Sequence, residues 1–184
     1  MSILALDLSK RSTGWSILPE GADKPIFGTA VLGSEFTCDG QTFGKLHQIL
    51  SDLRKICQFE HIFYEQAIHP ASLTGHTNID TLRVLSGLCA HVESFGYAVG
   101  CRTVTAVNVA SWRRHFVGRM PRATKSKQWK DYCIERCQQY GWSPRNSDEA
   151  DSLGLLDYGC EIRGFTPPWR VGEILRPLLA GTAR

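Results

Sequence analysis

The chain has 184 residues, of which 42% are hydrophobic and 21% are charged, and its formal net charge is +3. This is long enough for one domain with a sizeable core and too apolar for a disordered chain. No apolar run approaches the ~18 residues that cross a bilayer, and the N-terminus lacks the basic segment of an export signal, so we expect a cytoplasmic protein without membrane association.

Three predicted strands open the chain. Apolar and alternating residues predict strands over Ile3–Leu8, Thr13–Leu18 and Ile26–Leu32, and turn-forming residues separate them. Because the connections are short, we expect these strands to pair as antiparallel hairpins.

Strands and helices alternate in the next part of the chain. Apolar residues at helical spacing predict helices around residues 46–56 and 82–95. Two further strands are predicted over His61–Glu65 and Tyr97–Thr105. Together these elements predict an α/β fold with a mixed five-stranded sheet flanked by helices.

Three more helices are predicted to follow, each after a residue that favours a helix N-terminus. The expected caps are Asn108, Thr124, and either Asn146 or Ser147. We expect the last of these helices to end near Cys160. No linker interrupts the chain, so we predict a single domain over residues 1–184, with a peripheral tail over about residues 161–184.

Positive charge is concentrated in one segment. Residues 102–136 hold nine of the 21 Lys and Arg residues and only two of the 18 Asp and Glu residues. A polyanion is the natural partner of such a segment, although a solvated basic helix face is a common alternative. Trp112 and Trp129 lie within it at helical positions, where we expect core packing rather than base stacking.

Some residues of this segment, together with one residue near the N-terminus, are candidates for binding nucleic acid. Lys125 and Lys127 oppose the dipole at the start of a helix, which favours phosphate binding or stabilisation of transition-state charge. Ser9 lies in the turn after the first strand, where it could contact a phosphate or form the turn. Four arginines are expected to make general backbone contacts or to be solvated: Arg113, Arg114, Arg119 and Arg122.

Four carboxylates are the candidate catalytic residues. Asp7 and Glu65 each follow apolar strand residues, and Asp148 and Asp151 lie three apart, on one face of a helix. Taken singly, each acid could face solvent or complement the helix dipole. Taken together, they predict a site for Mg²⁺, with Mn²⁺ as a substitute, because both ions prefer carboxylate ligands. Two such ions can clamp the attacking and leaving oxygens of a phosphoryl displacement.

The acidic motifs resemble those of RuvC-type Holliday-junction resolvases, including phage-type or divergent members. The resemblance rests on Leu4-Ala5-Leu6-Asp7-Leu8-Ser9 with Thr13-Gly14-Trp15, on Phe63-Tyr64-Glu65-Gln66, and on Asp148-Glu149-Ala150-Asp151-Ser152-Leu153. It extends from about Ile3 to about Tyr158. The family often has an aromatic residue three positions after the second acid, whereas this chain has Ile68 followed by His69.

The resemblance implies an RNase H-like fold and a metal-dependent DNA endonuclease. It assigns the two ions to Asp7, Glu65, Asp148 and Asp151, and it implies a homodimer that nicks a four-way junction in pairs. Such an enzyme would act in the cytoplasm of a bacterial or phage-infected cell. Three alternatives remain open: an RNase H-like nuclease for RNA–DNA hybrid or other branched DNA, a non-catalytic junction-binding protein, and a transposase-like domain.

Overall fold

A mixed sheet forms the centre of the computed structural model, which describes residues 1–67, 79–121 and 124–171. Its strand order is β3-β2-β1-β4-β5. The strands are β1 (Ile3–Asp7), β2 (Thr13–Leu18), β3 (Ile26–Ala30), β4 (His61–Glu65) and β5 (Thr103–Val107). β2 pairs antiparallel with β1 and β3, whereas β4 pairs parallel with β1 and β5. The predicted mixed five-stranded sheet is therefore confirmed.

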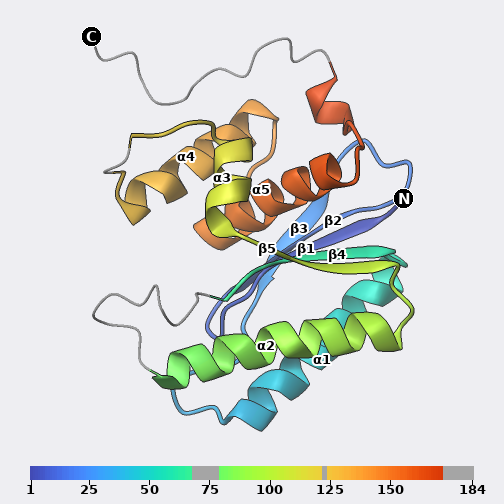
Figure 1. Cartoon of the computed structure of the whole chain (residues 1–184), viewed down its shortest axis with the longest axis vertical. Coiled ribbons are helices and arrows are strands. Elements are labelled where there is room, and N and C mark those ends of the chain that lie inside the picture. The colour runs from blue at the N-terminus through green and yellow to red at the C-terminus, as the bar shows by residue number, and fades with distance from the viewer. Residues whose placement is uncertain (68–78, 122–123, 172–184) are drawn as a thin grey trace.

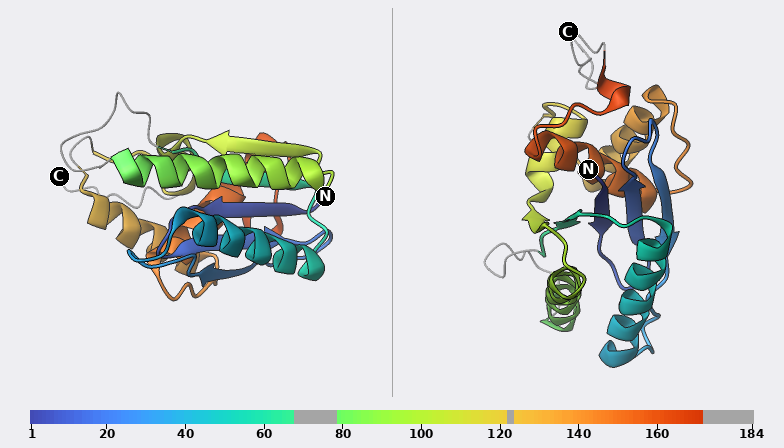
Figure 2. Two further views of the ribbon diagram at one scale, coloured as in Figure 1. Left: turned by 90° about the horizontal axis from the view of Figure 1, so that it is seen from below. Right: turned by 90° about the vertical axis from the view of Figure 1, so that its right-hand side faces the viewer.

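Helices cover both faces of this sheet (Figure 1). One layer holds α1 (Asp39–Ile56) and α2 (Ile79–Ala98), and the other holds α3 (Val109–Phe116), α4 (Ser126–Gln139) and α5 (Ser147–Ile162). The right-hand view in Figure 2 also places α1 and α2 below the sheet and α3, α4 and α5 above it. Within the described ranges, none of the helices has the length and apolarity needed to cross a membrane.

The alternation of strand side chains builds two separate cores. In β1, Ile3 and Ala5 pack towards α5, whereas Leu4 and Leu6 pack towards α1 and α2. Successive side chains of a strand point to opposite faces, so Asp7 lies on the same face as Ile3 and Ala5. The first acid of the sequence is thereby directed towards α5.

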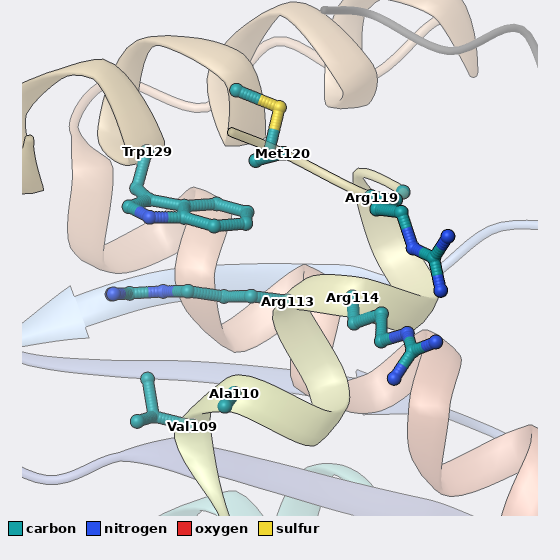
Figure 3. Close-up of a pocket in the computed structure, with 8 residues that line it drawn as sticks. Val109, Ala110, Arg113, Arg114, Arg119, Met120 and Trp129 are labelled. Carbon is teal, nitrogen blue, oxygen red and sulfur yellow. The ribbon is translucent and has the colours of Figure 1, made fainter. Parts of the chain in front are cut away.

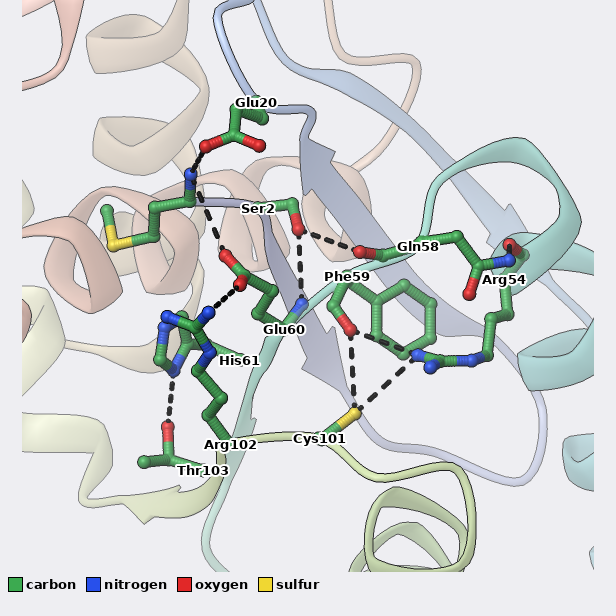
Figure 4. A network of polar contacts seen from close by, with 11 residues as sticks. Ser2, Glu20, Arg54, Gln58, Phe59, Glu60, His61, Cys101, Arg102 and Thr103 are labelled. Atoms are coloured by element: carbon green, nitrogen blue, oxygen red, sulfur yellow. Dashed lines mark hydrogen bonds and ion pairs between the residues drawn. The ribbon is translucent and has the colours of Figure 1, made fainter.

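A polar network fixes the end of the sheet where β1, β4 and β5 begin (Figure 4). The Arg54 guanidinium donates to the carbonyl oxygens of Phe59 at 3.0 Å and Val99 at 2.7 Å. His61 Nδ1 and Thr103 Oγ1 lie 2.8 Å apart and join β4 to β5. Burial lowers the pKa of His61, which favours its neutral form in this network. These contacts hold the three strands in register from the end opposite Asp7.

The fifth strand lies further along the chain than the sequence predicts. The predicted strand begins at Tyr97, but this residue is the penultimate residue of α2 and is exposed. α2 stops just before Gly100, whose φ of 73° is favourable only for a residue without a Cβ atom. The strand therefore begins at Thr103, after this turn.

The helix caps agree with the sequence at two of three places. The side chains of Asn108 and Asn146 accept hydrogen bonds from backbone N–H groups in the first turns of α3 and α5, as predicted. The cap predicted at Thr124 is wrong, because its hydroxyl donates to the Pro121 carbonyl at 2.7 Å and Lys125 takes the cap position of α4.

Part of the predicted peripheral tail is anchored to the core. The short 3-10 helix η2 (Pro168–Arg170) lies against α5 through the buried carboxylate of Asp157. Asp157 accepts hydrogen bonds from Trp169 Nε1 at 2.9 Å and Arg170 Nε at 2.6 Å, and His115 Nε2 lies 3.0 Å from its second oxygen. The remainder of the predicted tail lies outside the described residues.

Candidate active site

Two of the four candidate carboxylates stand at the ends of neighbouring parallel strands. Asp7 ends β1 and Glu65 ends β4, one step beyond the paired residues Leu6 and Tyr64. Phe63 packs in the same core as α5, so Glu65, two residues later, shares the face of Asp7. Parallel pairing thus places both acids at one edge of the sheet and on one side of it.

The other two carboxylates come from the first turns of α5. Asn146 caps this helix by accepting hydrogen bonds from the backbone N–H groups of Asp148 and Glu149 at 3.1 and 2.9 Å. α5 packs on β1 and β2, with Asp151 one turn beyond Asp148. The helix start therefore brings its two acids over the strand ends that carry the other pair.

A glycine allows this close approach of helix and sheet. Gly14 of β2 lies opposite Asp7 in the β1–β2 ladder. A Cβ atom at Gly14 would lie 2.0 Å from the carbonyl oxygen of Asp148. That contact is with helix backbone rather than with a flexible side chain, so it cannot be relieved without moving the start of α5.

Gly14→Ala is expected to displace Asp148 from the sheet edge. We expect a loss of about 1–3 kcal/mol in the free energy of unfolding, because the added methyl overpacks a rigid contact. Calorimetry should also show weaker Mg²⁺ binding, since two of the four acids move. Gly44→Ala is the matched control: a Cβ at this exposed helical position meets no atom within 4 Å, so this variant should be at least as stable as the parent. Gly14→Ala with unchanged melting and unchanged Mg²⁺ binding would contradict the prediction.

The four acids interact electrostatically. Burial raises the pKa of Asp7 well above its usual value, and the negative charges of Glu65, Asp151 and Asp148 raise it further. Burial also raises the pKa of Glu65 and of Asp151, with Arg113 opposing the shift in both cases. Such a cluster of like charges is unfavourable alone and favours the binding of cations.

Protein groups already contact three of the four carboxylates. The Trp112 indole N–H donates to Glu65 Oε2 at 3.0 Å, and Arg113 Nη2 donates to Asp151 Oδ2 at 3.1 Å. Lys130 Nζ lies 3.9 Å from Asp148 Oδ1. The other oxygen of Asp151 is buried and has no hydrogen-bond partner among the described residues.

The donor set suits Mg²⁺ or Mn²⁺, although the side chains are not in a finished coordination arrangement. Among the described residues, no three His, Cys, Asp or Glu side chains form a ready-made metal cluster. Divalent ions of this kind prefer carboxylate oxygens, and the unpartnered oxygen of Asp151 is such a ligand. Asp7, Glu65 and Asp148 are partly exposed, so these three carboxylates are accessible from solvent.

A fifth acid of the same region has a structural role. Glu149, between the two α5 acids, is fully buried and accepts hydrogen bonds from the backbone N–H of Arg145 at 2.7 Å and from its guanidinium at 2.6 and 2.9 Å. Both oxygens are therefore occupied, and Glu149 is not a candidate ligand.

The predicted nucleic-acid-binding arginines and lysines do not share one environment. Arg113 is mostly buried and belongs to the acid cluster rather than to a solvated surface. Arg114 and Arg119 line a cavity between α3 and α4 (Figure 3). Lys125 and Lys127 are exposed at the start of α4, as predicted.

The remaining predicted contacts fall into two groups. Ser9 forms the β1–β2 turn, where its N–H donates to Thr13 Oγ1 at 3.1 Å and its carbonyl accepts from the Thr13 hydroxyl at 2.6 Å. Its Oγ accepts a long hydrogen bond from the Ser12 N–H at 3.5 Å, which is consistent with a turn-forming role, and a phosphate contact stays a prediction. Arg122, Ile68 and His69 lie outside the described residues.

Two residues of the site were not predicted from the sequence. Trp112 was expected only as core, yet a buried indole N–H needs an acceptor and Glu65 supplies one. Lys130 lies one turn before the buried Cys133 of α4, which faces α5. The helical spacing of Lys130 and Cys133 was the available signal that this lysine approaches α5.

Comparison with known proteins shows the fold. No protein-family model and no curated protein matches the chain. Among solved structures, Thermus thermophilus RuvC in complex with a Holliday junction substrate is similar with a TM-score of 0.63 and 14% identity, over 89% of this chain and 96% of the other. The fowlpox virus Holliday junction resolvase gives a TM-score of 0.57 at 11% identity, over 89% and 99% of the two chains.

A third similar structure is the yeast mitochondrial Holliday junction resolvase, with a TM-score of 0.56 and 12% identity, over 83% of this chain and 75% of the other. These three structural neighbours are RuvC and Holliday junction resolvases of bacterial, viral and mitochondrial origin. The chain has the RuvC-like RNase H fold that the sequence motifs predict.

Proposed function

We propose that the protein is a metal-dependent endonuclease that cuts four-way DNA junctions. The observation that carries the proposal is the convergence of Asp7, Glu65, Asp148 and Asp151 at one sheet edge, with mutual repulsion that a divalent ion would relieve. Similarity to resolvases supports the substrate class, and two of the similar structures, from T. thermophilus and fowlpox virus, are complexes with Holliday junction DNA.

The four carboxylates would hold two Mg²⁺ ions, with Mn²⁺ as a substitute. Bound ions at such a site supply an activated water and charge stabilisation for an in-line phosphodiester displacement. Asp7 and Glu65 are held rigidly because they end adjacent parallel strands. Trp112 fixes the carboxylate of Glu65 by donating to one oxygen, which leaves the other oxygen available.

The basic segment would hold the nucleic acid. Arg113 lies at the acid cluster, and Lys125 and Lys127 present exposed cations at the start of α4, where they can pair with phosphates. The described part of each chain offers one acid cluster, whereas resolution of a junction needs two nicks on opposing strands. We therefore infer a homodimer with two-fold symmetry on the junction.

Cleavage of three substrates tests the proposal. A mobile four-way junction, a linear duplex of the same sequence and an RNA–DNA hybrid are incubated with the protein in Mg²⁺, Mn²⁺ or EDTA. We expect paired symmetric nicks in the junction, dependent on the ion, and little cutting of the duplex. Cutting of the hybrid alone would reassign the substrate to RNA. Tight binding of the junction without cutting in Mg²⁺ or Mn²⁺ would indicate a non-catalytic junction-binding protein.

A further inference from the structure

A cavity beside the acid cluster has the composition of a nucleotide site. It lies between α3 and the start of α4 and has a volume of about 380 Å³, within the ~300–1,000 Å³ typical of small-molecule sites. Val109, Ala110, Met120 and Trp129 supply apolar lining. Trp129 is only partly buried, although it packs against the core of α3, α4 and α5.

The opposite part of this cavity carries positive charge. Figure 3 shows the guanidinium groups of Arg114 and Arg119 next to each other, on the other side of the cavity from the Trp129 indole. Neither arginine forms an ion pair or a hydrogen bond with another described residue. The cavity therefore combines an aromatic face with two cations that have no anionic partner in the described part of the chain.

The cavity is joined to the acid cluster by one side chain. Arg113 lines the cavity and also donates to Asp151 at 3.1 Å. The side chain of Arg113 therefore reaches from the cavity lining to the acid cluster, so the two lie side by side.

We propose that this cavity takes one unstacked nucleobase of the nucleic-acid substrate, with the base against Trp129 and flanking phosphates paired with Arg114 and Arg119. The inference rests on the proposed function and adds a subsite to it. A base inside an intact duplex is stacked and paired, so its entry costs free energy, and this cost is smallest where pairing is already disturbed. The subsite would thereby favour DNA at a branch point over linear duplex.

The test pairs protein variants with DNA that lacks single bases. Binding to a four-way junction is measured by fluorescence anisotropy in EDTA, so that cleavage plays no part. Each junction of the DNA series carries a single abasic site, and the position of this site differs from one junction to the next around the branch point. The protein variants are Trp129→Ala, Trp129→Phe and Ala110→Trp. Thermal melting shows whether each variant is folded.

On the intact junction, Trp129→Ala is expected to bind about tenfold more weakly, because stacking of one base on an aromatic ring contributes ~1–3 kcal/mol. Trp129→Phe keeps a stacking face and should lose less. Ala110→Trp fills the cavity while leaving the core intact, and it should lose as much as Trp129→Ala. At one abasic position, the wild type, Trp129→Ala and Ala110→Trp should bind the junction with equal affinity, because the base that would enter the cavity is absent.

Several results would overturn the subsite. One is intact-junction binding that neither Trp129→Ala nor Ala110→Trp weakens. Another is that Trp129→Ala and Ala110→Trp bind more weakly than the wild type by the same factor at every abasic position. This would indicate a general weakening of binding rather than the loss of one base contact. If Trp129→Ala fails to fold, Ala110→Trp carries the test alone. Ion-dependent junction cutting combined with either negative result would leave the proposed nuclease standing and remove only the subsite. A wild type that neither binds the junction in EDTA nor cuts it in Mg²⁺ or Mn²⁺ would remove both.

Discussion

The Asp7→Asn variant is expected to lose about a thousandfold in the rate of junction cleavage in Mg²⁺. Asparagine keeps the size of the side chain but removes the negative charge at the end of the central strand β1. A bound ion supplies several kcal/mol of transition-state stabilisation, and each 1.36 kcal/mol corresponds to about a tenfold change in rate. Single-turnover cleavage, with saturating protein, is the measurement.

The same substitution is expected to make the metal-free protein more stable at neutral pH. Burial and the charges of Glu65, Asp151 and Asp148 raise the pKa of Asp7, so folding disfavours its ionised form. The sign follows from linkage: an acid with a raised pKa in the folded state destabilises the fold above its unfolded pKa, and neutral asparagine removes that penalty. The melting temperature in EDTA should therefore rise.

Asp23→Asn is the matched control for Asp7→Asn. Asp23 is exposed in the connection between β2 and β3, at the opposite end of β2 from Gly14, and the substitution changes the net charge by the same amount. It should leave both cleavage and melting unchanged. Full cleavage by Asp7→Asn would show that the reaction does not depend on the acid cluster, and the proposed function would fail.

Asp157→Asn is expected to destabilise the fold by about 3 kcal/mol, because loss of one partner of a buried ion pair leaves the other charge uncompensated. The Arg170 side chain, which pairs with Asp157, is only 9% exposed. For a chain of this size, the loss corresponds to a fall in melting temperature of roughly 6–12 °C. Differential scanning calorimetry is the measurement.

A second variant distinguishes loss of the charge pair from general disruption. Asp157→Asn combined with Arg170→Met removes both charges and keeps an apolar side chain of similar length. This double variant should recover part of the lost stability, because no buried charge is left unpaired. The double variant is compared with Asp157→Asn and with Arg170→Met alone. A loss of stability larger than the sum of the two single losses would contradict the claim that Asp157 and Arg170 stabilise the fold as a buried ion pair.

The pH dependence gives an independent check on Asp157. Burial alone would raise the pKa of this carboxyl, but hydrogen bonds and charge from Arg170 and His115 outweigh burial and hold the pKa at about 2. An acid with a depressed pKa stabilises the fold above its unfolded value and loses that contribution as the pH falls. The stability difference between wild type and Asp157→Asn should therefore be constant above about pH 4 and shrink towards pH 2.

The sequence predicts the sheet and the four acids well for one physical reason. Asp7 and Glu65 interrupt apolar strands, and burial of a carboxylate there is costly unless something compensates it. Asp151 stands out similarly among the apolar residues of α5. The period of two in β1 and β4 then determines which face carries Asp7 and Glu65, and the structure places both on the side of α5.

What the sequence does not predict depends on partners that are distant in the chain. Nothing local to Trp112 identifies Glu65 as its acceptor, since 47 residues separate them. The partial exposure of Trp129 depends on how α3 and α4 leave a cavity between them. The fifth strand is misplaced because the stretch from Tyr97 suits a strand locally, whereas Gly100 is needed to end α2 before the strand can begin.

Arg113 and Lys130 have a consequence for how the acid cluster would accept an ion. Each cation already lies at one carboxylate, Arg113 at Asp151 and Lys130 at Asp148. The protein therefore carries its own counterions, which reduce the repulsion among acids that would otherwise face one another unscreened. An arriving ion would compete with Arg113 and Lys130 for these two carboxylates, so loading the site would weaken one or both of the existing contacts. A guanidinium released from Asp151 in this way would remain beside the acids, where it would be available to pair with a phosphate.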